Sequence, residues 1–155
     1  MLKQLKIRNA TPSDVDLIFD WANDELVRKQ SFTSADIDYD THREWFSNKL
    51  EDENSLIFII EAQEIPASIV RFEIGDRSAT IGVSIAKEFR GKGFAVTTIN
   101  MGVDAYFNSY NLTILASIKP ENIASIKSFK KAGFEFLKEE KINGIESVTY
   151  QLTKP

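Results

Sequence analysis

The stretch 80–95 constrains the fold of this chain most, because a strand pattern, a glycine-bearing basic turn and a helix start follow one another in it. Its apolar residues Ile81, Val83 and Ile85 alternate with smaller ones, which is the period of a half-buried strand. Glycines in a turn let a ligand approach the backbone closely, and the free N–H groups and dipole at a helix start attract anions. The stretch therefore predicts a site for a phosphate or pyrophosphate group.

Two well-known phosphate-binding patterns do not fit this turn, Arg90-Gly91-Lys92-Gly93-Phe94-Ala95. The phosphate loop of nucleotide hydrolases ends in Gly-Lys-Ser/Thr, and the dinucleotide-binding fingerprint needs three glycines in a βαβ unit. The turn taken alone is equally compatible with a binding loop and with an ordinary surface connection between a strand and a helix.

Composition excludes several classes of protein. The 155 residues, 43% hydrophobic and 27% charged, fit one globular domain spanning 1–155. With no Cys and one His, we expect neither a thiolate nucleophile nor a metal site. A net charge of −4 argues against nucleic-acid binding, and no apolar run is long enough to cross a membrane. The first six residues are too polar for a signal peptide, so we expect a cytoplasmic protein.

The order of the predicted elements indicates an α/β fold. Strands are expected at 2–8, 55–61, 67–74, 81–85, 112–118, 134–142 and 147–152, and helices at 12–28, 41–50, 94–110 and 123–132. Asp40 or Thr41 is expected to cap the second helix, and Asn143-Gly144 is a preferred hairpin turn. These elements predict a mixed, mostly antiparallel sheet of about seven strands with about four helices.

Two segments match paired motifs of one enzyme superfamily. Residues 90–95 fit the pattern Gln/Arg-x-x-Gly-x-Gly/Ala. A second pattern, which runs from an Asn to a Gly-Phe pair, is largely met by Asn122, Ser125, Lys131, Gly133 and Phe134. Over its whole length the chain resembles the GNAT superfamily of acetyl-CoA-dependent N-acetyltransferases. The resemblance implies the GNAT-like fold and acetyl-CoA as cosubstrate, without a metal.

The resemblance also implies where acetyl-CoA would bind. Backbone N–H groups of Arg90, Gly91, Lys92, Gly93, Phe94 and Ala95 would hold the pyrophosphate. The backbone edge of Val83, Ser84 and Ile85 would pair with the pantetheine arm. Asn122 would contact pantetheine, and Ser125, Phe129 and Lys131 would contact the CoA beyond it. Asn122 can equally be a helix cap, and the two roles are compatible.

The residues for proton transfer depart from the family pattern. Phe129 stands where many members have a tyrosine acid, and Thr80 stands where many have a glutamate base. His42 is a candidate base because its unperturbed pKa lies near neutrality, although it can also be a surface histidine. Glu73 could act through water or be a solvated strand carboxylate. A backbone N–H near Val83 or Ile85 could hold the oxyanion in a direct attack.

The first two helices resemble those of members that acetylate the 4-amino group of nucleotide-linked amino-dideoxy sugars. Candidate acceptor contacts are Trp21, Arg28, Phe32, Trp45 and Arg71. Aromatic rings suit a sugar or a base, and the arginines could meet a phosphate, but the same aromatic residues can be core packing. The alternatives are an N-terminal acetyltransferase of ribosomal-protein type and a non-catalytic acyl-CoA-binding module. A homodimer is compatible with the sequence, which does not fix the oligomeric state.

Overall fold

The apolar and alternating segments assemble into one seven-stranded sheet in the computed structural model, which describes residues 4–33 and 35–155. The strands are β1 (Leu5–Asn9), β2 (Ser55–Ala62), β3 (Ile65–Ile74), β4 (Ser78–Ile85), β5 (Thr113–Ile118), β6 (Glu135–Ile142) and β7 (Ile145–Leu152). Their order is β1-β2-β3-β4-β5-β7-β6, and only the β4–β5 pair is parallel. The predicted mixed, mostly antiparallel sheet is confirmed. Positions 2 and 3 of the first predicted strand lie outside the described residues.

The helices differ from the expected four because the first one is interrupted. The described residues form α1 (Val15–Ala22), α2 (Glu25–Gln30), α3 (Tyr39–Glu51), α4 (Phe94–Phe107) and α5 (Ile123–Lys131). The Asn23 side chain accepts a hydrogen bond from the Ile37 N–H at 2.8 Å and donates one to its carbonyl at 2.9 Å. The Asp24 carboxylate then caps α2 by accepting the N–H groups of Leu26 and Val27. The first helix therefore ends at Asn23, whose side chain holds the loop at Ile37, and Asp24 starts a second helix.

The start of α3 also lies earlier than expected. The carboxylate of Asp38, rather than Asp40 or Thr41, accepts the Thr41 N–H at 3.2 Å and caps the helix. None of the helices in the described part of the chain is long and apolar enough to span a bilayer.

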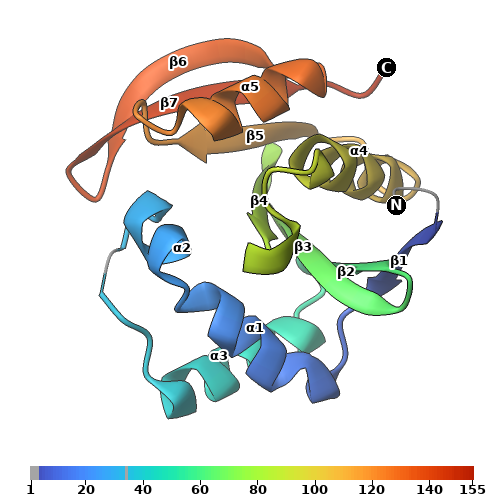
Figure 1. Cartoon of the computed structure of the whole chain (residues 1–155). Coiled ribbons are helices and arrows are strands. Elements are labelled where there is room, and N and C mark those ends of the chain that lie inside the picture. The colour runs from blue at the N-terminus through green and yellow to red at the C-terminus, as the bar shows by residue number, and fades with distance from the viewer. Residues whose placement is uncertain (1–3, 34) are drawn as a thin grey trace.

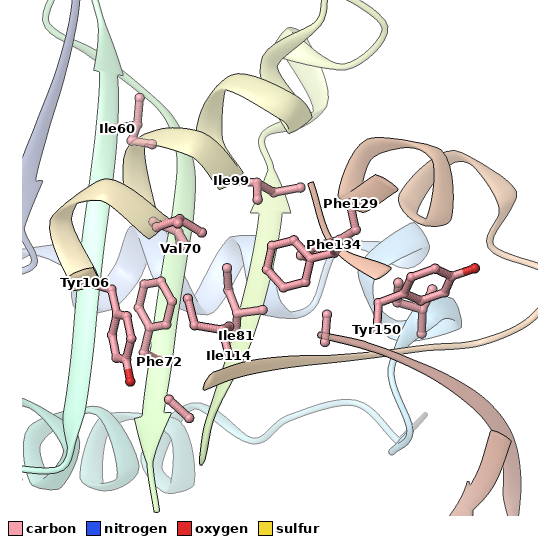
Figure 2. Close-up of a cluster of buried hydrophobic side chains, with 14 residues drawn as sticks. Ile60, Val70, Phe72, Ile81, Ile99, Tyr106, Ile114, Phe129, Phe134 and Tyr150 are labelled. Carbon is pink, nitrogen blue, oxygen red and sulfur yellow. The ribbon is translucent and has the colours of Figure 1, made fainter. Parts of the chain in front are cut away.

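The main hydrophobic core lies between α4 and the sheet. Figure 2 shows Phe72 of β3 beside Tyr106 of α4, and their ring centroids are 4.8 Å apart. Both side chains are fully buried. Gly102 lets α4 approach closely, since a Cβ at this position would lie 2.6 Å from a methyl group of Val70. This packing fixes α4, and with it the glycine turn at its start, relative to β3 and β4.

A second apolar cluster holds α1 and α3 on the opposite face of the sheet. Ile18 of α1 and Phe46 of α3 pack against Ile57, Ile59 and Ile69 of β2 and β3. In Figure 1, α1, α2 and α3 lie together on one side of β3 and β4, while α4 lies on the other side. The sheet is therefore a layer between two groups of helices. Within this layer, part of β4 has no neighbouring strand on its β5 side.

Candidate active site

The open edge belongs to β4, which pairs with β5 only at its start. The paired residues are Ser78 with Thr113, Ala79 with Ile114, and Thr80 with Leu115. Beyond Thr80 the two strands diverge, as Figure 1 shows. This divergence leaves one side of residues 81–85 without a neighbouring strand among the described residues.

The polar groups on this edge follow from strand alternation. The Ala86 N–H donates to the Ala67 carbonyl on β3 at 2.8 Å. Because alternate residues of a strand point their backbone groups to opposite sides, Ile81, Val83 and Ile85 present theirs to the open side. Such a row can accept an extended, amide-bearing ligand as an added strand. The predicted pantetheine edge therefore has free backbone groups at Val83, whereas the Ile85 carbonyl already accepts the Arg90 Nε at 3.1 Å.

The turn after β4 has the conformation of an anion-binding loop. Gly91 and Gly93 have φ values of 75° and 82°, which side-chain-bearing residues rarely adopt. The space around both Cα positions is open, and α4 begins directly at Phe94. The first N–H groups of a helix lack partners within the helix and favour negative charge. The turn therefore offers backbone N–H groups and a helix start to one anionic group.

Arg90 is held by the protein rather than free at the rim of the turn. Its Nε donates to the Ile85 carbonyl at 3.1 Å, and its Nη2 lies 2.8 Å from the Asp24 carboxylate. Burial acts to raise the pKa of Asp24, but the hydrogen bonds from Arg90 and from the α2 N–H groups outweigh it and lower the pKa. Arg90 therefore links the glycine turn to Asp24 at the start of α2. Lys92 is exposed, and the backbone is left as the main ligand for a pyrophosphate.

The second motif lies on α5, beside the open edge. Asn122 caps this helix by accepting the Ser125 N–H at 3.3 Å, and Lys131 is exposed at its end. The predicted side-chain contact of Phe129 with CoA needs correction. Phe129 is 5% exposed and packs edge-to-face on Phe134, with ring centroids 5.0 Å apart. Its ring is part of the core because the inward face of α5 must cover β5.

The Glu73 carboxylate is engaged in two contacts with other elements. One carboxylate oxygen lies 3.0 Å from Lys49 Nζ, and the other accepts the Ser55 hydroxyl at 3.1 Å. Both interactions stabilise the charged carboxylate and tie β3 to α3 and β2. Both carboxylate oxygens are thus engaged within the protein, and a role of Glu73 as base through water stays a prediction.

His42 is buried, which corrects the expectation that it acts as the base. Its side chain is 3% exposed and lies among the rings of Phe19, Trp45 and Phe46, at centroid distances of 5.3, 5.7 and 6.1 Å. Burial lowers its pKa, although the Val15 carbonyl, 3.2 Å from Nε2, favours the protonated form. The imidazole lies between α1 and α3 and presents almost no surface to a bound amine. His42 packs the second cluster instead.

The buried imidazole should make stability depend on pH. Because folding lowers the pKa of His42, the unfolded chain binds more protons once the pH falls to about 6.5, the ordinary histidine value. We expect the free energy of unfolding to decrease from pH 7 to 5.5, by at most about 1.4 kcal/mol per pH unit for one proton. His42→Gln removes the only histidine and should flatten this slope. Urea denaturation of both proteins at the two pH values measures it, and equal slopes would contradict the assignment.

Arg28 stabilises the loop after α2 rather than pointing at a ligand. Its guanidinium donates to the carbonyls of Ala22 at 2.6 Å, Thr33 at 2.9 Å and Ala35 at 3.3 Å, and to the Ser31 hydroxyl at 3.2 Å. The predicted phosphate contact therefore needs correction, because four of its five donor positions are used within the protein. The positive charge nevertheless remains, since all these acceptors are neutral.

Of the other candidate acceptor contacts, some pack inside the protein and some are exposed. Trp21 is half-buried against the second cluster, and the backbone carbonyl of Phe32 accepts the Asn143 side chain at 3.4 Å. Trp45 and Arg71 come together on the sheet face that carries α3, where the guanidinium carbon lies 5.6 Å from the ring centroid. Only this last pair combines an aromatic ring with an exposed cation beside β4.

Some residues that shape the site are not evident from the motifs. Asp24, which holds Arg90, lies in a polar segment that reads as an uninterrupted helix. Gly82, inside a strand pattern, gives room to Arg71: a Cβ there would lie 3.1 Å from the Arg71 Nε. A glycine within a strand often marks such a close approach, so this signal was available in the sequence.

The two hollows described on the surface lie away from this site. Two shallow hollows lie beside β1 and on the outer side of α3, and neither is lined by β4, the glycine turn or α5. In the described part of the chain, no group of three or more metal-ligating side chains comes together.

Comparison with known proteins agrees with this geometry. A family model described as an acetyltransferase (GNAT) domain matches residues 4–135. Spermidine N(1)-acetyltransferase of Vibrio cholerae is 30% identical over 139 residues, which cover 86% of this chain and 80% of that protein. A structure of the V. cholerae spermidine N-acetyltransferase with CoA and spermine is similar with a TM-score of 0.86 at 24% identity, covering 97% of this chain and 95% of the other.

AAC(6′)-Ib in complex with ribostamycin and coenzyme A has a TM-score of 0.85 at 18% identity, covering 98% of this chain and 94% of the other. At this level of identity the similarity concerns the fold. The family match covers most of the chain, and the diverging β4–β5 pair and the glycine turn lie within it. The chain therefore belongs to the GNAT superfamily and is an acyltransferase that uses acetyl-CoA.

Proposed function

We propose that this enzyme moves the acetyl group of acetyl-CoA to the primary amine of a small molecule, by direct attack within a ternary complex. The observation that carries the proposal is the open backbone edge of β4, which leads into the glycine turn at the start of α4. Pantetheine along this edge would place the thioester beside β4 and the pyrophosphate at the turn. The N–H of Val83 or Ile85 would then hold the oxyanion.

The proton steps need no side-chain acid at the usual position. The amine nitrogen attacks the thioester carbon, the C–S bond breaks, and the CoA thiolate leaves with water as its proton donor. The ammonium proton passes to solvent. Phe129 cannot donate a proton and lies in the core, while the carboxylate of Glu73 and the imidazole of His42 are engaged elsewhere. A chain without cysteine cannot form an acetyl-cysteine intermediate.

For the acceptor, we propose a nucleotide-linked 4-amino-dideoxy sugar. The Trp45 ring and the adjacent Arg71 support this class, since an aromatic face suits a sugar or a base and a guanidinium suits a phosphate. A polyamine is the second candidate, favoured by the 30% identity with a spermidine N(1)-acetyltransferase. The cytoplasmic location and the homodimer stay predictions of the sequence.

Thiol release from acetyl-CoA tests the proposal. The purified protein is assayed with a nucleotide-linked 4-amino sugar, spermidine, an aminoglycoside and a peptide with a free N-terminus. We expect turnover with a small-molecule amine and none with the peptide. Turnover with the peptide alone would favour an N-terminal acetyltransferase, and acetyl-CoA binding without turnover on any amine would favour a non-catalytic module.

A further inference from the structure

Arg71 is a guanidinium without a protein partner beside the proposed reaction centre. Within residues 4–33 and 35–155 it donates no hydrogen bond and forms no ion pair with a carboxylate. Part of its side chain is exposed to solvent, and the rest leans on the Trp45 ring of α3 on one side and over Gly82 of β4 on the other. The packing fixes the position of the guanidinium but leaves its planar fork of donors unused.

No acid of the described residues forms an ion pair with Arg71, and a second guanidinium acts on it from a distance. Reduced hydration is the main cause that lowers the pKa of Arg71, Glu73 opposes this effect, and the charge of Arg28 lowers the pKa further. Arg28 keeps its full charge because it donates only to carbonyl and hydroxyl oxygens. Two guanidinium groups thus influence each other where no carboxylate of the described chain pairs with either.

The nearest acid does not supply the missing charge. Glu73 lies two residues along β3, about 7 Å from Arg71 at the spacing of a strand. Its carboxylate is already paired with Lys49 at 3.0 Å. Glu73 therefore acts on Arg71 only from a distance and forms no ion pair with it, so the donors of the guanidinium stay available to a ligand.

We propose that Arg71 binds an anionic group of the acceptor, so that the enzyme selects amines that carry a carboxylate or a phosphate and disfavours polyamines. The inference rests on the proposed acetyl transfer to a small amine and assigns the charge class of that amine. Arg71 pairs with Gly82 across the strands, one residue from the Val83 N–H proposed to hold the oxyanion. Because a strand rises about 3.3 Å per residue, an anion held by Arg71 would lie close to an amine that reacts beside Val83.

An anion site at Arg71 would distinguish this chain from the spermidine N(1)-acetyltransferase that it resembles. Spermidine carries several positive charges at neutral pH, and a cation placed at Arg71 would meet repulsion from a guanidinium that forms no ion pair within the described residues. An anionic group would instead gain a fork of charge-assisted hydrogen bonds. Specificity of this kind needs both the attraction and the repulsion, and one side chain supplies both.

Matched pairs of amines test the inference by thiol release. Glucosamine 6-phosphate is compared with glucosamine, and alanine with alaninamide, so that each pair differs by the anionic group; spermidine is the polycation. We expect kcat/KM for the anionic member to exceed that of the neutral member by roughly 10- to 100-fold in at least one pair, and to exceed that of spermidine. The phosphate and carboxylate pairs distinguish the two sources of the anion.

Arg71→Gln should bring the ratio within the preferred pair to about one, and Arg71→Lys should retain part of it because the charge remains without the fork. Comparing one pair between variants cancels the different basicity of the two amines. Arg77→Gln is the matched control: it removes the same charge from the exposed turn between β3 and β4, and the ratio should persist.

Calorimetric titration of the probe amines into the CoA-bound protein tests the inference even if no amine is acetylated. Glucosamine 6-phosphate or alanine should bind more weakly to Arg71→Gln than to the wild type. If no amine is acetylated but this difference in binding is seen, the proposed function fails and the Arg71 site stands. Three results would overturn the inference while leaving acetyl transfer in place. They are turnover that prefers spermidine, equal binding of the anionic probes to both proteins, and weaker acetyl-CoA binding in Arg71→Gln.

Discussion

Gly93→Asp should weaken acetyl-CoA binding by about 100-fold or more while leaving the fold intact. The substitution places a carboxylate at the start of α4, where the pyrophosphate would meet the free N–H groups. Like charges brought together at a binding site cost several kcal/mol, and about 2.7 kcal/mol corresponds to 100-fold. A residue with a side chain at φ 82° adds strain of about 1 kcal/mol. Calorimetric titration of acetyl-CoA into both proteins measures the effect.

Gly144→Asp is a matched control for backbone strain. Gly144 lies in the β6–β7 hairpin with a φ of 76°, and no atom lies within 4 Å of a Cβ added there, as at Gly93. Both variants should therefore lose similar stability on urea denaturation, but only Gly93→Asp should lose acetyl-CoA binding. Equal affinity of the two variants for acetyl-CoA would rule out the glycine turn as the pyrophosphate site.

Phe72→Ala should have the largest effect on stability, lowering the free energy of unfolding by about 3–5 kcal/mol. Phe72 is fully buried, stacks on Tyr106 at 4.8 Å and meets Phe58 edge-to-face at 6.4 Å. Its removal leaves a cavity under α4 that the surrounding strands can fill only in part. Since domains of this size are stable by about 5–15 kcal/mol in total, a substantial share of the stability should disappear. The midpoint of urea denaturation, followed by circular dichroism, reports the loss.

Phe136→Ala makes the same chemical change at the edge of the sheet. Phe136 lies on β6, is 53% exposed and contacts Tyr150 with ring centroids 5.8 Å apart. Its replacement should cost less than about 1 kcal/mol, as for most surface substitutions. A comparable loss in the two variants would mean that the stack between Phe72 and Tyr106 does not anchor α4.

The sequence predicted the backbone conformation of the proposed cofactor site well, because that conformation is set locally. The glycine turn, the helix start and the strand edge of Val83 and Ile85 depend on local conformation, which glycine and alternating apolar residues specify directly. The hairpin at Asn143-Gly144 is a similar case, since both residues have positive φ as its preferred turn requires.

The side-chain roles were harder to predict because they depend on partners far away in the sequence. His42 differs little in sequence context from a surface histidine, and only the packing of α1 on α3 buries it. Glu73 is paired with Lys49, 24 residues away, and Asn23 is hydrogen-bonded to Ile37, 14 residues away. Local patterns contain no information on such contacts.

The sequence by itself thus determined the order of the strands and helices, the glycine turn before α4 and the family, because short-range periodicity and motif spacing encode them. Only the tertiary structure decided which charged groups stay free. Among the predicted acceptor contacts, Arg28 is used by its own loop, whereas Arg71 lies exposed between Trp45 and Gly82. The physical reason is that a charge is available to a ligand only if no nearby group neutralises it, and proximity is set by the fold.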